Sequence, residues 1–157
     1  MDWIIRKLDT LKFHTNLDEL LRPLEKEIGE FKWLITDLEI NTIELESLPI
    51  NLEEDWHLLA ADEMDCVRKS DSQMIWGVFS ALPKDLEINP NLIDLPFADG
   101  NDKVWETGNL QLEHSKIEII AWDSSFTIVK FTDRGMSQKF KRHFKDALPL
   151  KQVSDFM

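Results

Sequence analysis

Two apolar runs of strand length, residues 117–122 (Ile-Glu-Ile-Ile-Ala-Trp) and 126–131 (Phe-Thr-Ile-Val-Lys-Phe), form the clearest pattern in the chain. β-branched and aromatic residues dominate both runs, and the polar link Asp123-Ser124-Ser125 between them favours a turn. The pattern therefore predicts an antiparallel hairpin. Apolar residues occupy both alternating sets of positions in the first run, which is typical of a central strand covered on both faces.

Two further runs, 31–36 and 73–82, have the composition of strands, and Pro83 ends the second of them. A helix is expected after Asn16, whose side chain can cap the free backbone N–H groups of a first turn. The apolar spacing that follows is helical, but Pro23 lies within it and should kink or divide the helix.

A C-terminal helix is predicted to begin with a cap at Ser137 and to continue through Leu148. Met136, Phe140, Phe144 and Leu148 recur every four residues and should form its buried stripe. The predicted fold class is therefore α+β, a mainly antiparallel sheet with a C-terminal helix and one or two N-terminal helices packed on it.

Other segments give weaker patterns. Residues 2–13 allow either a short helix or an edge strand, and residues 43–46 alternate as a half-exposed strand does. Residues 65–72 are polar and are expected to form a loop, and residues 84–109 look mostly irregular. No repeat or composition boundary divides the chain, so residues 1–157 are predicted to form a single domain.

Composition narrows the function classes. The formal net charge of −12 opposes general nucleic-acid binding and favours cationic partners. Cys66 is the only cysteine, so no internal disulfide or cysteine zinc site is expected; we interpret it as a small buried filler. Residues 1–7 lack the features of a signal peptide, and no apolar run approaches membrane-spanning length, so a cytoplasmic location is expected.

The negative charge is concentrated. Residues 33–67 contain no Lys or Arg, and their acids are Asp37, Glu39, Glu44, Glu46, Glu53, Glu54, Asp55, Asp62, Glu63 and Asp65. Such a tract is either a solvated acidic face or a face that binds a cationic partner. Trp56 lies among these acids and is either an aromatic anchor for that partner or a side chain that packs inward.

The predicted partner-binding residues are the acids around Trp56 together with Trp56 itself. They are Glu44, Glu46, Glu53, Glu54, Asp55, Trp56, Asp62, Glu63 and Asp65. The last 28 residues are basic, and Lys139, Lys141, Arg142 and Lys145 are expected on the exposed face of the C-terminal helix. In isolation they resemble a phosphate-binding patch, but we expect them to be used internally, against the acidic face.

No catalytic constellation is found, so the chain is not predicted to be an enzyme and no catalytic residue is named. The scattered glycines build no phosphate-binding loop, and no cofactor is expected. His14, His57, His114 and His143 come from distant segments, so no metal site is predicted. Paired carboxylates such as Glu53 with Glu54 are too abundant to indicate a glycosidase.

A small, acidic, Trp-rich and cysteine-poor chain of this kind resembles bacterial immunity proteins, which neutralise a toxin by masking its active site. The order of residues 31–35, residues 75–83 and the 117–131 hairpin is also similar to a group of uncharacterised bacterial proteins. The resemblance implies a cationic toxin domain, in some cases a nuclease, as the partner. Two alternatives stay open: a structural or regulatory domain, and a hydrolase that uses convergent carboxylates or histidines.

Overall fold

The computed structural model describes the whole chain except residues 7–10, 12 and 155–157. Its centre is a seven-stranded antiparallel sheet with the order β3-β2-β4-β5-β6-β1-β7. The strands are β1 (Trp3–Ile5), β2 (Phe31–Thr42), β3 (Trp56–Leu59), β4 (Ser72–Pro83), β5 (Ile117–Trp122), β6 (Phe126–Phe131) and β7 (Leu148–Pro149). The predicted α+β class with a mainly antiparallel sheet is confirmed.

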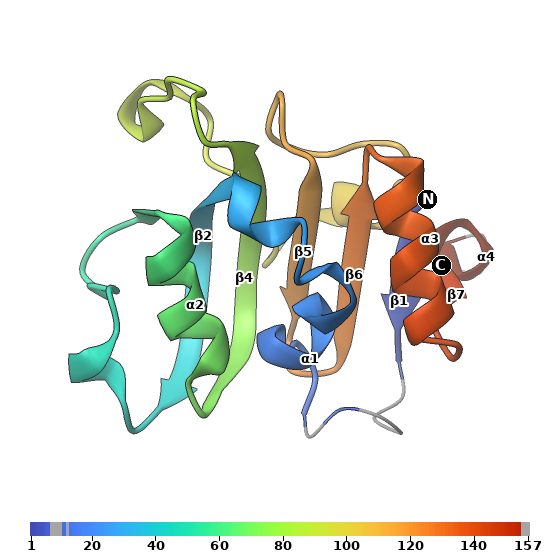
Figure 1. The fold of residues 1–157 in the computed structure, drawn as a ribbon, viewed down its shortest axis with the longest axis horizontal. Coiled ribbons are helices and arrows are strands. Elements are labelled where there is room, and N and C mark those ends of the chain that lie inside the picture. The colour runs from blue at the N-terminus through green and yellow to red at the C-terminus, as the bar shows by residue number, and fades with distance from the viewer. Residues whose placement is uncertain (7–10, 12, 155–157) are drawn as a thin grey trace.

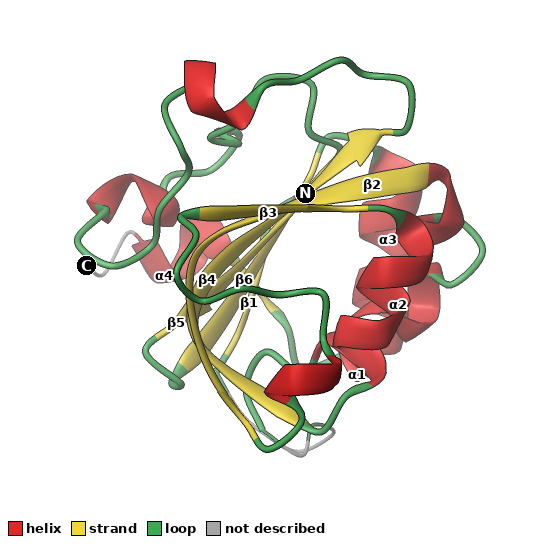
Figure 2. Cartoon of the chain, turned by 90° about the vertical axis from the view of Figure 1, so that its left-hand side faces the viewer, coloured by secondary structure: helices red, strands yellow, loops and turns green. Residues whose placement is uncertain are grey.

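Helices α1, α2 and α3 cover one face of the sheet, as Figures 1 and 2 show. The α-helices are α1 (Leu17–Leu21), α2 (Ala61–Lys69), α3 (Arg134–His143) and α4 (Leu150–Ser154). The 3₁₀ turns are η1 (Arg22–Leu24), η2 (Ile28–Glu30), η3 (Leu45–Ser47), η4 (Pro90–Leu92) and η5 (Asp102–Trp105). Helix α4 lies across the sheet from α1, α2 and α3 (Figure 2).

The central strand β5 is covered on both faces, as its sequence predicts. Ile117 and Ile119 face the large core under α1, α2 and α3, whereas Ile120 faces a second core that also contains Val104 and Leu150. The irregular chain between β4 and β5 and helix α4 cover this second face. Burial of apolar surface on both sides is the main contribution to the stability of such a sheet.

The hairpin and the helices match their predictions in most respects. At the hairpin turn Asp123 and Ser124 have positive φ angles of 49° and 56°, as the two central residues of a type I′ turn require. The side chain of Asn16 accepts a hydrogen bond from Glu19 N and caps α1, which ends before Pro23.

The C-terminal helix has different limits from those predicted. The side chain of Asp133, not Ser137, caps it by accepting from Met136 N at 2.8 Å, and the helix ends at His143. Phe140 and Phe144 are buried as predicted, but Leu148 belongs to β7.

Three segments differ from their predictions or settle an open alternative. Residues 43–46 do not form a strand, because η3 begins within them. The predicted loop 65–72 is wrong in its first half, which continues helix α2 from Ala61. Within residues 2–13, Trp3–Ile5 form β1, an inner strand between β6 and β7; part of the rest lies outside the described residues.

None of the helices in the described part of the chain is long and apolar enough to cross a bilayer.

Candidate functional site

Residues 44–65 of the acidic tract lie at the β3 edge of the sheet. Within the described residues strand β3 pairs only with β2, with Thr36 opposite Trp56, and it therefore ends the sheet. The chain from η3 to α2 surrounds this edge, on the left in Figure 1 and toward the viewer in Figure 2. The fold thus brings residues 44–65 to one end of the molecule.

The predicted partner-binding residues divide into two groups at this edge. Glu46, Glu53, Glu54, Asp55 and Asp62 are exposed. The other acids make bonds within the chain. Glu44 accepts from Asp71 N at 2.6 Å, Glu63 accepts from Ala60 N at 2.9 Å at the start of α2, and Asp65 binds the buried Arg68 at 2.8 Å. Glu63 is also exposed, but one of its carboxylate oxygens is bonded within the chain, so only the first group is available in full to a partner.

Trp56 has one buried side and one accessible side. It is half-buried, packs against the cluster that contains Leu34 and Leu82, and donates from Nε1 to Asn91 Oδ1 at 3.2 Å. The interpretation that it packs inward is therefore correct for part of the indole. The rest of the ring is accessible, and in the sequence Trp56 directly follows the exposed run Glu53–Asp55.

The basic face of α3 does not oppose this edge, which corrects the expectation that the two neutralise each other. Helix α3 contacts β6 and η1, at the other end of the sheet from β3. Lys139 bonds Glu27, which lies outside the tract, and Lys141 donates to two backbone carbonyls. The exposed acids at β3 are therefore not neutralised by this helix.

A cluster of buried charged residues lies on the sheet face opposite α1, α2 and α3, and the sequence analysis did not predict it. Glu118 and Lys130, both fully buried, stand opposite each other in the β5–β6 register, and buried Asp2 accepts from Phe131 N at 3.4 Å. The signal was present in the sequence, because each charge interrupts an apolar run on a strand predicted to be covered.

This cluster holds one segment of the irregular chain, residues 106–111. Lys130 Nζ donates to Glu106 O at 2.8 Å and to Asn109 O at 3.0 Å. Glu118 Oε2 accepts from Gln111 N at 2.7 Å, and Asp2 Oδ2 accepts from Gly108 N at 2.7 Å. The bonds satisfy backbone groups of a loop that has no strand partner, so we interpret the cluster as structural.

Burial shifts the pKa values of both strand residues. It raises the pKa of Glu118, against the lowering effects of the Gln111 N–H and of Lys130. Burial lowers the pKa of Lys130, and the carboxylates of Glu118, Asp2 and Glu106 oppose this shift.

The raised pKa predicts a pH dependence of stability that Glu118→Gln should remove. The folded chain holds the Glu118 proton more tightly than the unfolded chain, so this residue contributes most stability below its ordinary pKa of 4.5. That contribution should fall as the pH rises through the higher folded pKa. Urea unfolding across this range measures the free energy of unfolding of the unmodified chain and of Glu118→Gln. The value for the unmodified chain minus the value for the variant should fall as the pH rises.

The exposed Glu113 supplies the control for this experiment. Glu113→Gln should keep the pH dependence of the unmodified chain, because the Glu113 side chain is exposed and lies outside the buried cluster. An identical pH dependence in Glu118→Gln and in the unmodified chain would contradict the prediction.

The histidines and Cys66 do not form a catalytic or metal-binding group among the described residues. His14 and His57 are buried, and burial lowers the pKa of each. His114 and His143 are exposed. Among the described residues no group of three or more His, Cys, Asp or Glu is placed to hold a metal ion. Cys66 is exposed on α2, so its interpretation as a buried filler was wrong.

Comparison of the chain with models of known families, with curated proteins and with solved structures finds no significant match in any of the three.

Proposed function

We propose that this chain is a non-catalytic protein-binding module whose acidic β3 edge binds a cationic protein. An immunity protein that masks a basic toxin domain, such as a nuclease domain, would have this role. The observation that carries the proposal is the set of exposed acids, Glu53, Glu54 and Asp55, which directly precedes the partly exposed indole of Trp56 in the chain.

The charge arrangement supports a partner of opposite charge. No Lys or Arg occurs between residues 33 and 67, and the basic helix α3 lies at the other end of the sheet. Asp62 and Glu63 share a cavity with Lys32 and Lys84, whereas Glu53, Glu54 and Asp55 have no ion pair within the described part of the chain. These three acids repel one another, and a cationic partner relieves that repulsion on binding. Complementary charge also accelerates association and makes it depend on salt.

Trp56 is a second reason to place the centre of an interface at this edge. Its indole is fixed by strand β3 and by the bond to Asn91, so little conformational freedom is lost on binding. Tryptophan is among the residues that most often dominate the binding energy of an interface, especially where neighbouring contacts exclude water from it. The acids would then steer the partner, and the indole would hold it.

The proposal is tested by binding kinetics after a partner has been captured from cells of the same species. Reversal of Glu53, Glu54 and Asp55 to Lys should slow association by about tenfold or more at low salt. Trp56→Ala should speed dissociation by about thirtyfold, the equivalent of about 2 kcal/mol. Trp56→Phe, which keeps most of the inward packing, separates loss of binding from loss of folding.

The matched control for the reversal is a chain with Glu25, Asp102 and Glu113 changed to Lys. All three are exposed and lie outside the tract, so the net charge changes by the same amount. This control should bind nearly as the unmodified chain does. Equal slowing by both triple changes would mean that only net charge matters and would contradict a defined acidic interface.

A further inference from the structure

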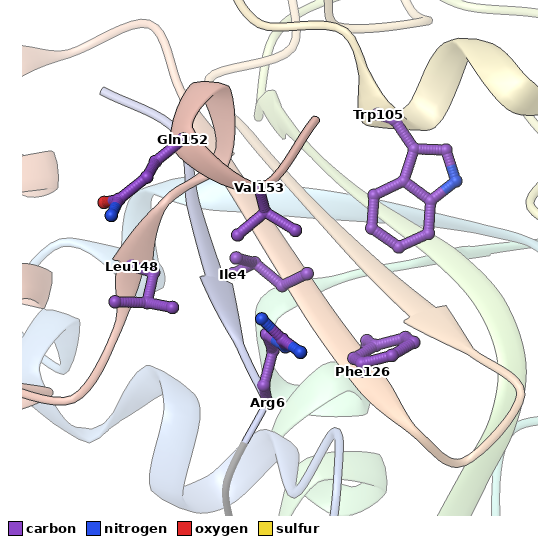
Figure 3. A pocket seen from close by; sticks show the side chains of 7 residues that line it. All are labelled: Ile4, Arg6, Trp105, Phe126, Leu148, Gln152 and Val153. Atoms are coloured by element: carbon purple, nitrogen blue, oxygen red, sulfur yellow. The ribbon is translucent and has the colours of Figure 1, made fainter. Parts of the chain in front are cut away.

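An apolar groove lies at the end of the sheet opposite the acidic edge. It has a volume of about 400 Å³ and is lined by Ile4 of β1, Trp105 of η5, Phe126 of β6, Leu148 of β7 and Val153 of α4. Figure 3 shows these side chains arranged around a common space, with the guanidinium of Arg6 at its margin. Sites for small molecules are typically concavities of about 300–1,000 Å³ with mainly apolar linings.

The lining is built on a fixed aromatic support. Trp105 meets Trp122 edge to face at 5.2 Å, and Trp122 meets Trp76 in the same way at 4.9 Å. Phe126 also contacts Trp105, with ring centroids 5.9 Å apart. Such edge-to-face pairs hold the rings in place, so the apolar wall needs little rearrangement to receive a ligand.

A second cavity, of about 590 Å³, continues the groove and carries positive charge. It shares Arg6, Phe126 and Leu148 with the first cavity and adds Lys141 and Lys145. Among the described residues that line it, Asp146 is the only acid, so the cations exceed the acids there. This excess of cations stands out in a chain with a net charge of −12.

The cations differ in how they are held. Lys141 Nζ donates to the carbonyls of Lys145 and Ala147 at 2.7 and 2.8 Å and lies 5.6 Å from the centre of the Trp3 ring. Its charge is therefore fixed in position. Arg6 and Lys145 are exposed, and within the described residues neither side chain has an ion pair.

We infer that this groove binds a small free amphiphilic carboxylate, such as a medium-chain fatty acid. The apolar body lies between Trp105, Phe126 and Val153, and the carboxylate reaches Arg6 and Lys145. A neutral apolar ligand would leave the cations unused, and a fully polar anion would leave the apolar lining in water. Only a molecule with both parts matches the whole surface.

The test uses the full chain, with decanoate as the anionic probe and 1-decanol as its neutral counterpart, both below their aggregation limits. Decanoate should bind with one site per chain by titration calorimetry, and more tightly than decanol. Joint substitution Arg6→Gln and Lys145→Gln should weaken decanoate binding by about fivefold or more. Binding of decanol should stay unchanged, a separation that misfolding cannot produce.

Two further variants locate the site. The double change Lys69→Gln and Lys84→Gln removes two exposed cations that do not line the groove. It should leave the affinity for decanoate unchanged. Val153→Glu places a carboxylate in the apolar part of the groove and should abolish decanoate binding. Retention of the unmodified melting temperature by Val153→Glu confirms that the fold is intact.

Several outcomes would overturn the inference. Equal affinity for decanoate and decanol, or decanoate affinity that ignores Arg6 and Lys145, would remove its electrostatic basis. Association with vesicles of phosphatidylglycerol without binding of free decanoate would assign the face to a lipid surface instead.

Discussion

Replacement of Phe140 by Ala should lower the free energy of unfolding by about 3–5 kcal/mol. Phe140 is 1% exposed and lies between two other rings, 5.5 Å from Phe131 on β6 and 4.7 Å from Phe144. Truncation removes the apolar contacts that join α3 to the sheet and leaves a cavity, because rigid strands beneath the helix cannot close the space.

Urea unfolding followed by fluorescence measures this change, and Gln138 of the same helix supplies the control. Gln138 is exposed, and Gln138→Ala should change the free energy of unfolding by less than about 0.5 kcal/mol. A loss below about 1 kcal/mol for Phe140→Ala would contradict the assignment of α3 to the core.

Replacement of Lys130 by Met should also cost about 3–5 kcal/mol, for an electrostatic reason. Met keeps the length of the side chain but cannot donate to Glu106 O and Asn109 O. It also removes the cation that faces buried Glu118 and Asp2. Uncompensated buried charge and unpaired carbonyls are both costly in an apolar setting.

A double-mutant cycle with Glu118→Gln isolates the electrostatic part of this cost. The double variant should be more stable than the sum of the single changes predicts, by about 1 kcal/mol or more, because the lost cation no longer leaves a charged carboxyl behind. The exposed Lys116, replaced by Met, serves as the control. Additive effects of Lys130→Met and Glu118→Gln would contradict coupling between them.

The sheet could be predicted where its strands have a strong local pattern. Residues 117–122 and 126–131 are strands with the predicted limits, and the two apolar sets of β5 face two separate cores. β-branched residues on both faces determine this outcome locally, so neighbouring elements need not be known.

Short or charged elements could not be predicted in the same way. Strand β3 has four residues, and its neighbours Glu53–Asp55 obscure its pattern. Helix α2 buries Met64 and Val67 but is otherwise rich in charge, so its stability comes from contacts with β2 and from the bonds of Arg68 to Asp18 and Asp65. Those contacts depend on the tertiary fold and leave little trace in the local sequence.

The candidate sites also differ in how far the local sequence predicts them. The acidic tract is continuous in sequence, and its placement at one edge follows from that continuity. The groove combines β1, η5, β6, β7 and α4, so its lining depends on the order of the strands. The pair Glu118 and Lys130 lies between these cases, because the register of the predicted hairpin already places them opposite each other.

The most direct test of the acidic interface is the association rate constant of the captured partner at low and high salt. It is measured with the unmodified chain, with the Glu53, Glu54 and Asp55 reversal, and with the Glu25, Asp102 and Glu113 control. We predict fast, salt-sensitive association for the unmodified and control chains, and slow association with little salt dependence for the reversal at the β3 edge. Rate constants that are the same for all three chains at both salt concentrations would contradict the proposal that this edge binds a cationic protein.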